Sequence, residues 1–461
     1  MRESGTLDRH ISRLTDAVRR LYRRGAKRNL SRLLGKMRPE DLAAVLDGMT
    51  PDEQLGVFKT AIRDYSEVAG AVLVGMDPAE MHGLLSQLEP KEIARAVEPL
   101  PIDDAVLVVD ALPDETKDQV LELVDLEGSE ELQTQLNYAE DTAGRIMTTE
   151  FFALSEDTPI GVAIEKIREA GEVEMIFYLY VINAEGELSG VLSLRQLLLS
   201  PPHQTLGEVA TRSLITVRVS TDQEEVARLA SRYDLLAIPV VDELNRLVGL
   251  VTVDDIVDIV LEEADEDFLK MVGTTDDELL HRERSWRVAR IRLPWILVNL
   301  VGLVATGLLF KYFEVTLAEA IFLVFFAPLI MGMSGNVGSQ TATIAVRGLA
   351  TGRLGQGQQG TRAFVGQQLR VGALLGLVCA PIAALLAFAF EGNLGFGVVV
   401  AVSLFLAIAM ASFNGSLVPV LFQRLGVDPA VAAGPMVTTS SDLIGIAIYF
   451  GTAALMIDWL R

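Results

Sequence analysis

The sequence predicts a multidomain membrane protein with an all-α helical-repeat domain, a tandem α/β pair, a long acidic connecting helix and a five-helix transmembrane domain. The formal net charge is −23, yet half of the residues are hydrophobic. A strong negative charge and a high hydrophobic content occur in one chain because acidic residues dominate up to about residue 283 and long apolar runs follow. The acidic half also contains two internal repeats. We expect the four parts at 1–142, 143–262, 263–283 and 284–461.

Prolines recur along the first part, mostly at steps of 11–12 residues, and each is followed within three residues by an acidic residue. Proline suits the first helical turn, where its missing N–H is not needed, and acid there complements the helix dipole. Each step is expected to be a short helix, and the helices to stack as a small superhelix. The sequence leaves open whether this domain is a spacer or takes part in regulation. The prolines are Pro39, Pro51, Pro78, Pro90, Pro101 and Pro113.

A second duplication follows the helical repeats. Residues 175–199 read as strand, turn, strand and helix, and residues 235–260 repeat that order. In each copy the second strand passes through a glycine, Gly190 or Gly249, before the helix begins. Two such units in tandem resemble a pair of CBS domains, which often bind adenine nucleotides.

The end of the second copy offers a candidate nucleotide site. Residues 252–255, Thr-Val-Asp-Asp, resemble the Thr-x-x-Asp signature that holds a ribose phosphate in CBS pairs. Residues 193–196 of the first copy are Ser-Leu-Arg-Gln, with glutamine where an acidic residue is expected. The candidate nucleotide ligands are therefore Thr252, Asp255 and Arg195. ATP is the candidate cofactor beside Mg²⁺, and the sequence leaves its binding open.

Five apolar spans follow, and each approaches or exceeds the ~20 residues that a helix needs to cross a bilayer. Arginines cluster before the first span and in the expected loop at 342–370, whereas the expected loops at 311–318 and 391–395 carry few charges. Because cytoplasmic loops are enriched in Lys and Arg, we expect a cytoplasmic N-terminus and a C-terminus outside the cell membrane. The spans are expected near 291–310, 319–341, 371–390, 396–422 and 430–457.

Asp442 is the only ionisable residue deep inside an expected span. A charge near the bilayer centre costs about 2.5–3.5 kcal/mol, so such residues usually face a bundle interior or a water-filled path. Thr438 begins a polar stretch that leads to it. The alternative is a structural carboxyl that is hydrogen-bonded to a neighbouring helix. Because five spans cannot form a twofold inverted repeat within one chain, a symmetric pore would require two chains.

One aspartate from each of two chains suits hydrated Mg²⁺, which keeps several waters and is usually held by one or two carboxylates. Metals that prefer thiolate or imidazole would need Cys or His, which the expected pore region lacks. The second span also places Asn336 and Gln340 near membrane depth, after Pro328 and among several glycines. Irregular polar backbone at that depth is tolerated only inside protein or beside water. Close helix packing would explain the glycines equally well.

Two stretches resemble the MgtE family of Mg²⁺ channels: PLIMGMSGNVGSQTAT at 328–343 and GVDPAVAAGPMVTTSSDLIG at 426–445. The order of helical repeat, CBS pair, acidic helix and five spans is similar to that of the family as well. The sequence departs from the family pattern at Ser334 and Gly434. The resemblance implies a homodimer in the lipid bilayer, with a Mg²⁺ pore between the paired membrane domains.

The resemblance also implies roles for single residues. Asp442 matches the pore aspartate that binds hydrated Mg²⁺, and Thr438 matches a position whose backbone carbonyl faces that site. Asn336 and Gln340 match the polar motif of the second span, and Asp428 matches an acid at the cytoplasmic mouth.

Eight carboxylates fall within 254–267, next to the first span. Such a run alone is usually a solvated acidic face. A lever would occupy this place, however, and acids at helical spacing would repel neighbouring acids until divalent ions screened them. High internal Mg²⁺ would then close the channel. The resemblance implies a plug helix at 264–282 and sensor acids at Asp255, Asp258, Glu263, Glu266 and Asp267.

The sequence argues against several other functions. A net acidic cytoplasmic half does not suit nucleic acid as a partner, because phosphate binding needs patches of Lys and Arg. We find no nucleophile–base pair and no GxxxxGK[ST] loop, so we expect no enzymatic activity. The single cysteine, Cys379, allows no disulfide within the chain. Two alternatives stay open: an ion-coupled divalent-cation carrier, and a membrane-anchored sensor of Mg²⁺ or nucleotide.

Overall fold

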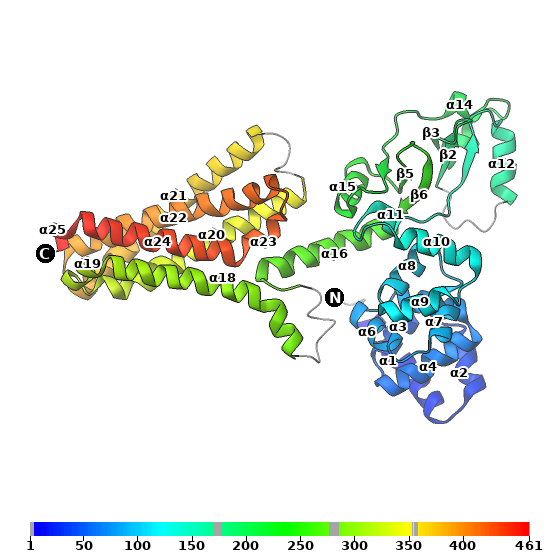
Figure 1. Ribbon diagram of the computed structural model, residues 1–461, viewed down its shortest axis with the longest axis horizontal. Coiled ribbons are helices and arrows are strands. Elements are labelled where there is room, and N and C mark those ends of the chain that lie inside the picture. The colour runs from blue at the N-terminus through cyan, green and yellow to red at the C-terminus, as the bar shows by residue number, and fades with distance from the viewer. Residues whose placement is uncertain (1–3, 170–176, 276–284, 353, 355–357, 461) are drawn as a thin grey trace. The chain divides into compact units, whose positions relative to one another are not determined.

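The computed structural model describes residues 4–169, 177–275, 285–352, 354 and 358–460. The chain divides into two compact units, Met1–Leu261 and Glu262–Arg461, and each is described by itself (Figure 1).

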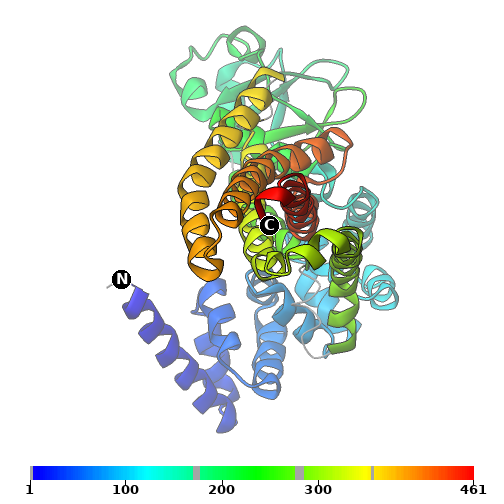
Figure 2. The ribbon, with the colours of Figure 1, turned by 90° about the vertical axis from the view of Figure 1, so that its left-hand side faces the viewer.

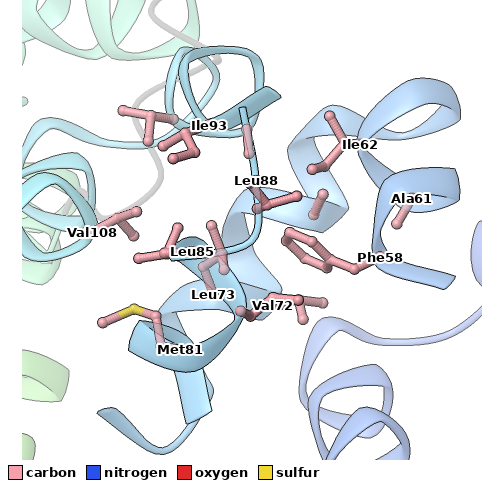
Figure 3. Packing of buried hydrophobic residues seen from close by; sticks show 14 of the residues in the cluster. Phe58, Ala61, Ile62, Val72, Leu73, Met81, Leu85, Leu88, Ile93 and Val108 are labelled. Carbon is pink, nitrogen blue, oxygen red and sulfur yellow. The ribbon is translucent and has the colours of Figure 1, made fainter. Parts of the chain in front are cut away.

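Short helices build the first part of the first unit, as the proline steps predict. Four of them begin with proline at the first helical position, and the next two begin directly after Pro101 and Pro113. Their apolar sides form one core, in which Phe58, Leu73, Leu85 and Ile93 meet (Figure 3). The helices are α1 (Ser4–Arg23), α2 (Lys27–Leu34), α3 (Pro39–Asp47), α4 (Pro51–Asp64), α5 (Ser66–Val74), α6 (Pro78–Leu85), α7 (Pro90–Val97), α8 (Ile102–Asp110), α9 (Asp114–Leu121) and α10 (Leu126–Leu136).

The two α/β copies have the same topology. In each, the first strand pairs with the second in parallel, and the second pairs with the third antiparallel. The first copy contains β1 (Ala153–Ser155), α12 (Ile160–Glu169), β2 (Tyr178–Ile182), β3 (Leu188–Ser193) and α13 (Leu194–Leu199). The second contains β4 (Val217–Arg218), α15 (Gln223–Tyr233), β5 (Ala237–Val241), β6 (Leu247–Thr252) and the start of α16 (Val253–Val272). Short helices α11 (Ala143–Ile146) and α14 (Leu206–Val209) complete this region.

The glycines that mark each copy lie where another chain segment crosses a strand. Gly190 pairs with Val181 and Gly249 pairs with Val240, so the two occupy equivalent register positions. A side chain at 249 would lie 2.6 Å from Sδ of Met147, and one at 190 would lie 2.6 Å from Cβ of Ala210. Glycine is therefore required by close approach and not by backbone conformation.

Helix α16 belongs to both units, because it runs without a break across the expected boundary at 262. The sequence predicted a helix to about 282, and this was wrong: α16 ends at Val272. Gly273 has a φ of +81°, and the amide of Thr274 donates to the carbonyl of Leu269 at 3.0 Å. Glycine with positive φ and this hydrogen bond are typical of a helix C-terminus. The rest of the predicted plug helix, from residue 276, lies outside the described residues.

Long helices lie side by side in the second unit (Figures 1 and 2). Three of the described helices are long and apolar enough to cross a membrane, at Ser285–Tyr312, Gly360–Glu391 and Leu394–Arg424. Helices α20 and α24 coincide with the other two expected spans, and polar residues interrupt both. The helices are α18 (Ser285–Tyr312), α19 (Glu314–Glu319), α20 (Leu323–Ala350), α21 (Gln358–Glu391), α22 (Leu394–Arg424), α23 (Pro429–Ala433), α24 (Pro435–Leu455) and α25 (Ile457–Leu460).

Helix α20 is continuous through Pro328 and its glycines. The expected bounds of the next loop, 342–370, were wrong, because α20 continues to Ala350 and α21 begins at Gln358. The hydroxyls of Ser334 and Thr341 donate to the carbonyls of Ile330 and Val337 four residues earlier, at 2.8 and 2.9 Å. Gly335 and Gly338 lie in close contact with α24, whereas nothing lies within 4 Å of a methyl group at Gly332.

Candidate functional site

The polar stretch of α24 is contacted by three other helices. The hydroxyl of Thr439 donates to Oδ1 of Asn299 on α18 at 2.5 Å. The side-chain amide of Asn414 on α22 donates to Ser440 and Ser441 at 2.8 and 3.0 Å. These contacts fix the rotation of α24 and leave Thr438 and Asp442, one turn apart, facing α20.

Gly335 of α20 makes room for Asp442. A methyl group at position 335 would lie 2.6 Å from Oδ1 of Asp442 and 3.3 Å from Cγ2 of Thr438. The same interface continues at Gly338, where a methyl group would lie 3.1 Å from Cβ of Ser441. Small residues on α20 therefore let α24 approach closely enough to seat the carboxylate.

One carboxylate oxygen of Asp442, Oδ1, is buried and has no hydrogen-bond partner among the described residues. Buried polar atoms are nearly always hydrogen-bonded, so an exception needs an explanation such as a bound ion or water. The hydroxyl of Thr438 donates to the carbonyl of Gly434 at 3.2 Å, so the unpartnered oxygen of Asp442 is the oxygen that this interface offers to a hard cation. The structural alternative would need a neighbouring helix to donate to this oxygen, and no described residue does.

The structure does not bring the two amides of the second span to Asp442. Asn336 and Gln340 are one turn apart on an exposed face of α20, and neither is hydrogen-bonded to Asp442 within the described part of the chain. A site within one chain therefore contains Asp442 and Thr438 without them.

Asp428 forms a second cluster at the start of α23. Its Oδ1 accepts from the amide of Ala430 at 2.8 Å, and its Oδ2 accepts from Nζ of Lys270 at 2.7 Å. Lys270 also pairs with Glu266 at 2.6 Å. Burial and then the negative charge of Asp428 raise the pKa of Asp267 to about 6. We refer to Glu263, Glu266, Asp267, Lys270 and Asp428 as the mouth cluster.

The predicted sensor acids fall into two groups. Glu263, Glu266 and Asp267 belong to the mouth cluster in the second unit, whereas Asp255 and Asp258 lie in the first unit. Asp258 is exposed. The sequence predicted one acidic face, but the sequence could not show that α16 contacts different neighbours along its length.

Asp255 faces another acid, Asp103 of α8, that sequence reasoning missed. Burial, and then the negative charge of Asp255, raise the pKa of Asp103 to about 7. Burial likewise raises the pKa of Asp255. Oδ1 of Asp103 is buried and has no hydrogen-bond partner in the described segments. Two close, desolvated carboxylates repel each other, and a divalent cation between them would remove that repulsion.

No group of three or more His, Cys, Asp or Glu side chains in the described ranges is arranged to hold a metal ion directly.

Two of the three predicted nucleotide ligands, Thr252 and Asp255, are bonded to each other at a helix start. The hydroxyl of Thr252 donates to the carboxylate of Asp255 at the start of α16. In the first copy, Ser193 and Gln196 form a reciprocal capping pair, and Arg195 is exposed. A pocket of about 290 Å³ lies in the second copy, lined by Arg218, Glu225 and Asp242 among others. It contains none of the three predicted ligands.

Comparison with known families divides the chain into three matched regions. Residues 37–141 match the MgtE intracellular N domain, and residues 143–201 and 206–262 match the CBS domain. Residues 327–452 match the MgtE family, described as a divalent cation transporter.

Known proteins are similar to this chain over most of its length. The magnesium transporter MgtE of Bacillus subtilis is 34% identical over 437 residues, 92% of this chain and 96% of that protein. Magnesium transporter MgtE of Thermus thermophilus is 33% identical over 454 residues, 97% of this chain and 99% of that protein. A crystal structure of the cytosolic domain of the Mg²⁺ channel MgtE in complex with ATP is 33% identical, with a TM-score of 0.50. It covers 53% of this chain, and 99% of that structure is matched.

Proposed function

The chain belongs to the MgtE family of transporters, and we propose that it is a Mg²⁺ channel that admits Mg²⁺ into the cell and is closed by internal Mg²⁺. The relatives are magnesium transporters and not enzymes, and the chain carries both family domains that precede the membrane region.

The observation that carries the pore proposal is the unpartnered oxygen of Asp442. A carboxylate seated between helices at an interface of small residues, with one oxygen unsatisfied, is arranged to bind something that enters from outside the chain. Hydrated Mg²⁺ fits, because the Asp442 carboxylate can accept hydrogen bonds from its retained waters, and in this proposal the backbone carbonyl of Thr438 is a further acceptor.

We propose that two chains share this pore. One carboxylate per chain is too few to hold a divalent ion alone, and no complete cluster exists among the described residues of one chain. Asn336 and Gln340 line an exposed face of α20, which a second copy would bury near the shared axis. Crosslinking of a cysteine variant at 336 in native membranes tests the two-chain pore, and the absence of a crosslinked dimer would contradict it.

In the same proposal all five long helices cross the bilayer, with the N-terminus in the cytoplasm and the C-terminus outside.

The gate is proposed to consist of the two acidic groups. The Asp103–Asp255 pair and the mouth cluster are both dominated by carboxylates that lie close together. At low internal Mg²⁺, repulsion between the carboxylates would favour separation of their elements, and at high Mg²⁺ the bound ions would favour the closed arrangement. Several weak sites are needed to shift such an equilibrium far. In this proposal α16 carries the closing movement to the pore.

ATP binding at the CBS pair is a further proposal. It is supported by the similar cytosolic domain that was crystallised in complex with ATP. Thr252, Asp255 and Arg195 are its candidate ligands, although Thr252 and Asp255 are already bonded to each other. Calorimetric titration of ATP into the wild-type protein tests whether ATP binds, and the same titration into Thr252→Val tests whether it binds at Thr252.

A flux assay in proteoliposomes tests the function itself. Mg²⁺ entry would be followed with an internal Mg²⁺ dye at a fixed membrane potential, with and without proton and sodium gradients. Entry that follows the Mg²⁺ gradient and potential alone supports a channel. Entry that requires a second ion gradient would instead favour a coupled carrier.

A further inference from the structure

The end of α16 is docked onto the start of α23 and α24. Met271 packs against a buried apolar cluster that includes Ala430 and Val437. The backbone of Gly434 lies so close to the carbonyl of Met271 that a side chain at 434 would collide with it. A methyl group at Gly273 would lie 3.2 Å from the ring of Trp295. This junction is therefore closely packed.

The charges around the junction would oppose this docking if Lys270 were absent. Two carboxylates of the mouth cluster, Glu266 and Asp428, pair with the ammonium group of Lys270, and the charges of Lys270, Glu263 and Glu266 act on Asp267. Nζ of Lys270 lies 2.6 Å from Glu266 and 2.7 Å from Asp428. Its side chain is only 23% exposed, so water screens these charges less than it screens a surface pair.

We propose that Lys270 is a positioning residue of the gate, whose ammonium occupies the place between α16 and Asp428 that a bridging divalent ion would otherwise take. The gating role of Lys270 rests on the proposed function, whereas its contacts with Glu266 and Asp428 do not depend on that function. Because Lys270 bridges Glu266 on its own helix to Asp428 on another segment, it holds the two segments together when Mg²⁺ is absent. Closure then has a component that does not depend on Mg²⁺ at this cluster.

The Lys270 ammonium also limits where Mg²⁺ can bind. Mg²⁺ gives up water reluctantly and requires octahedral geometry, so it cannot enter between Glu266 and Asp428 while the Lys270 ammonium is within hydrogen-bond distance of both carboxylates. Ions that act at this junction therefore bind around Lys270 and not in its place.

A labelling experiment on the full-length protein in nanodiscs tests the contact independently of transport. Met271→Cys would be introduced with Cys379→Ala, and its maleimide labelling rate measured in buffer with a Mg²⁺ chelator. Lys270→Met removes the charge and is expected to raise that rate about tenfold, the change that about 1.4 kcal/mol produces. Lys270→Arg should restore slow labelling, and the matched control Lys311→Met, which alters an exposed lysine at the end of α18, should not change it.

Mg²⁺ flux in the same variants separates the two proposals. The variant Lys270→Met should need more internal Mg²⁺ to close, and Lys270→Arg should behave like the wild type. Faster labelling with unchanged closure would support the positioning role of Lys270 but contradict the proposed gate. Equal labelling of the wild type and Lys270→Met without Mg²⁺ would overturn the inference, whatever the flux shows.

Discussion

Replacing Gly335 with alanine should impair Mg²⁺ transport because it removes the space in which Asp442 is seated. The new methyl group would lie 2.6 Å from Oδ1 of Asp442, and Cβ atoms essentially never approach a heavy atom within 3.0 Å. Either the carboxylate or the whole of α24 has to move. Overpacking of this kind costs about 1–3 kcal/mol. If the conducting arrangement bears that cost, transport falls by roughly 5- to 150-fold.

Gly332→Ala, one turn earlier on α20, is the matched control. Nothing lies within 4 Å of a methyl group there, and both substitutions gain the same helix propensity. Mg²⁺ uptake into proteoliposomes would be measured at equal protein content for both variants. Normal transport by a folded Gly335→Ala variant would refute the reasoning. Equal losses in both variants would show that the effect belongs to glycine replacement in general and not to Asp442.

Three further predictions concern other positions. Asp442→Asn should abolish selective Mg²⁺ uptake while leaving the unfolding temperature near that of the wild type, and retained uptake would contradict the pore assignment. Because the pKa of Asp103 is raised to about 7, its ionisation opposes folding, and stability falls as the pH rises from about 4 to 7. Asp103→Asn should therefore raise the unfolding temperature in Mg²⁺-free buffer more at pH 8 than at pH 5, and an equal rise at both would contradict this. Gly249→Ala should destabilise the CBS pair by about 1–3 kcal/mol in chemical unfolding, because its methyl group would meet Met147, and an unchanged midpoint would argue against that contact.

Local patterns in the sequence predicted much of the fold. Proline followed by acid marked the helix starts in the first part, because both residue types suit the first helical turn. The two α/β copies were visible because strand, turn and helix recur in the same register around Gly190 and Gly249. These features depend on neighbouring residues, so a single sequence contains them.

Contacts between distant segments could not be predicted in the same way. Asp103 lies far from Asp255 in the chain, and nothing in the residues around it distinguishes it from Asp104 beside it. Nothing in the sequence around Lys270 indicated its role, because its partner Asp428 is 158 residues away. The end of α16 was missed because the acidic pattern continues past Gly273, although a glycine there is a recognised signal for a helix C-terminus.

The most direct test of a Mg²⁺-closed channel is patch-clamp recording from inside-out membranes while internal Mg²⁺ is stepped from micromolar to millimolar. Wild-type protein is compared with a variant in which Asp255, Asp258 and Glu266 are neutralised. We predict Mg²⁺ currents that shut at high internal Mg²⁺ in the wild type and persist in the variant. Currents that close at the same internal Mg²⁺ in both would contradict the sensor, and inserted protein that passes no Mg²⁺ current at any level would contradict the channel.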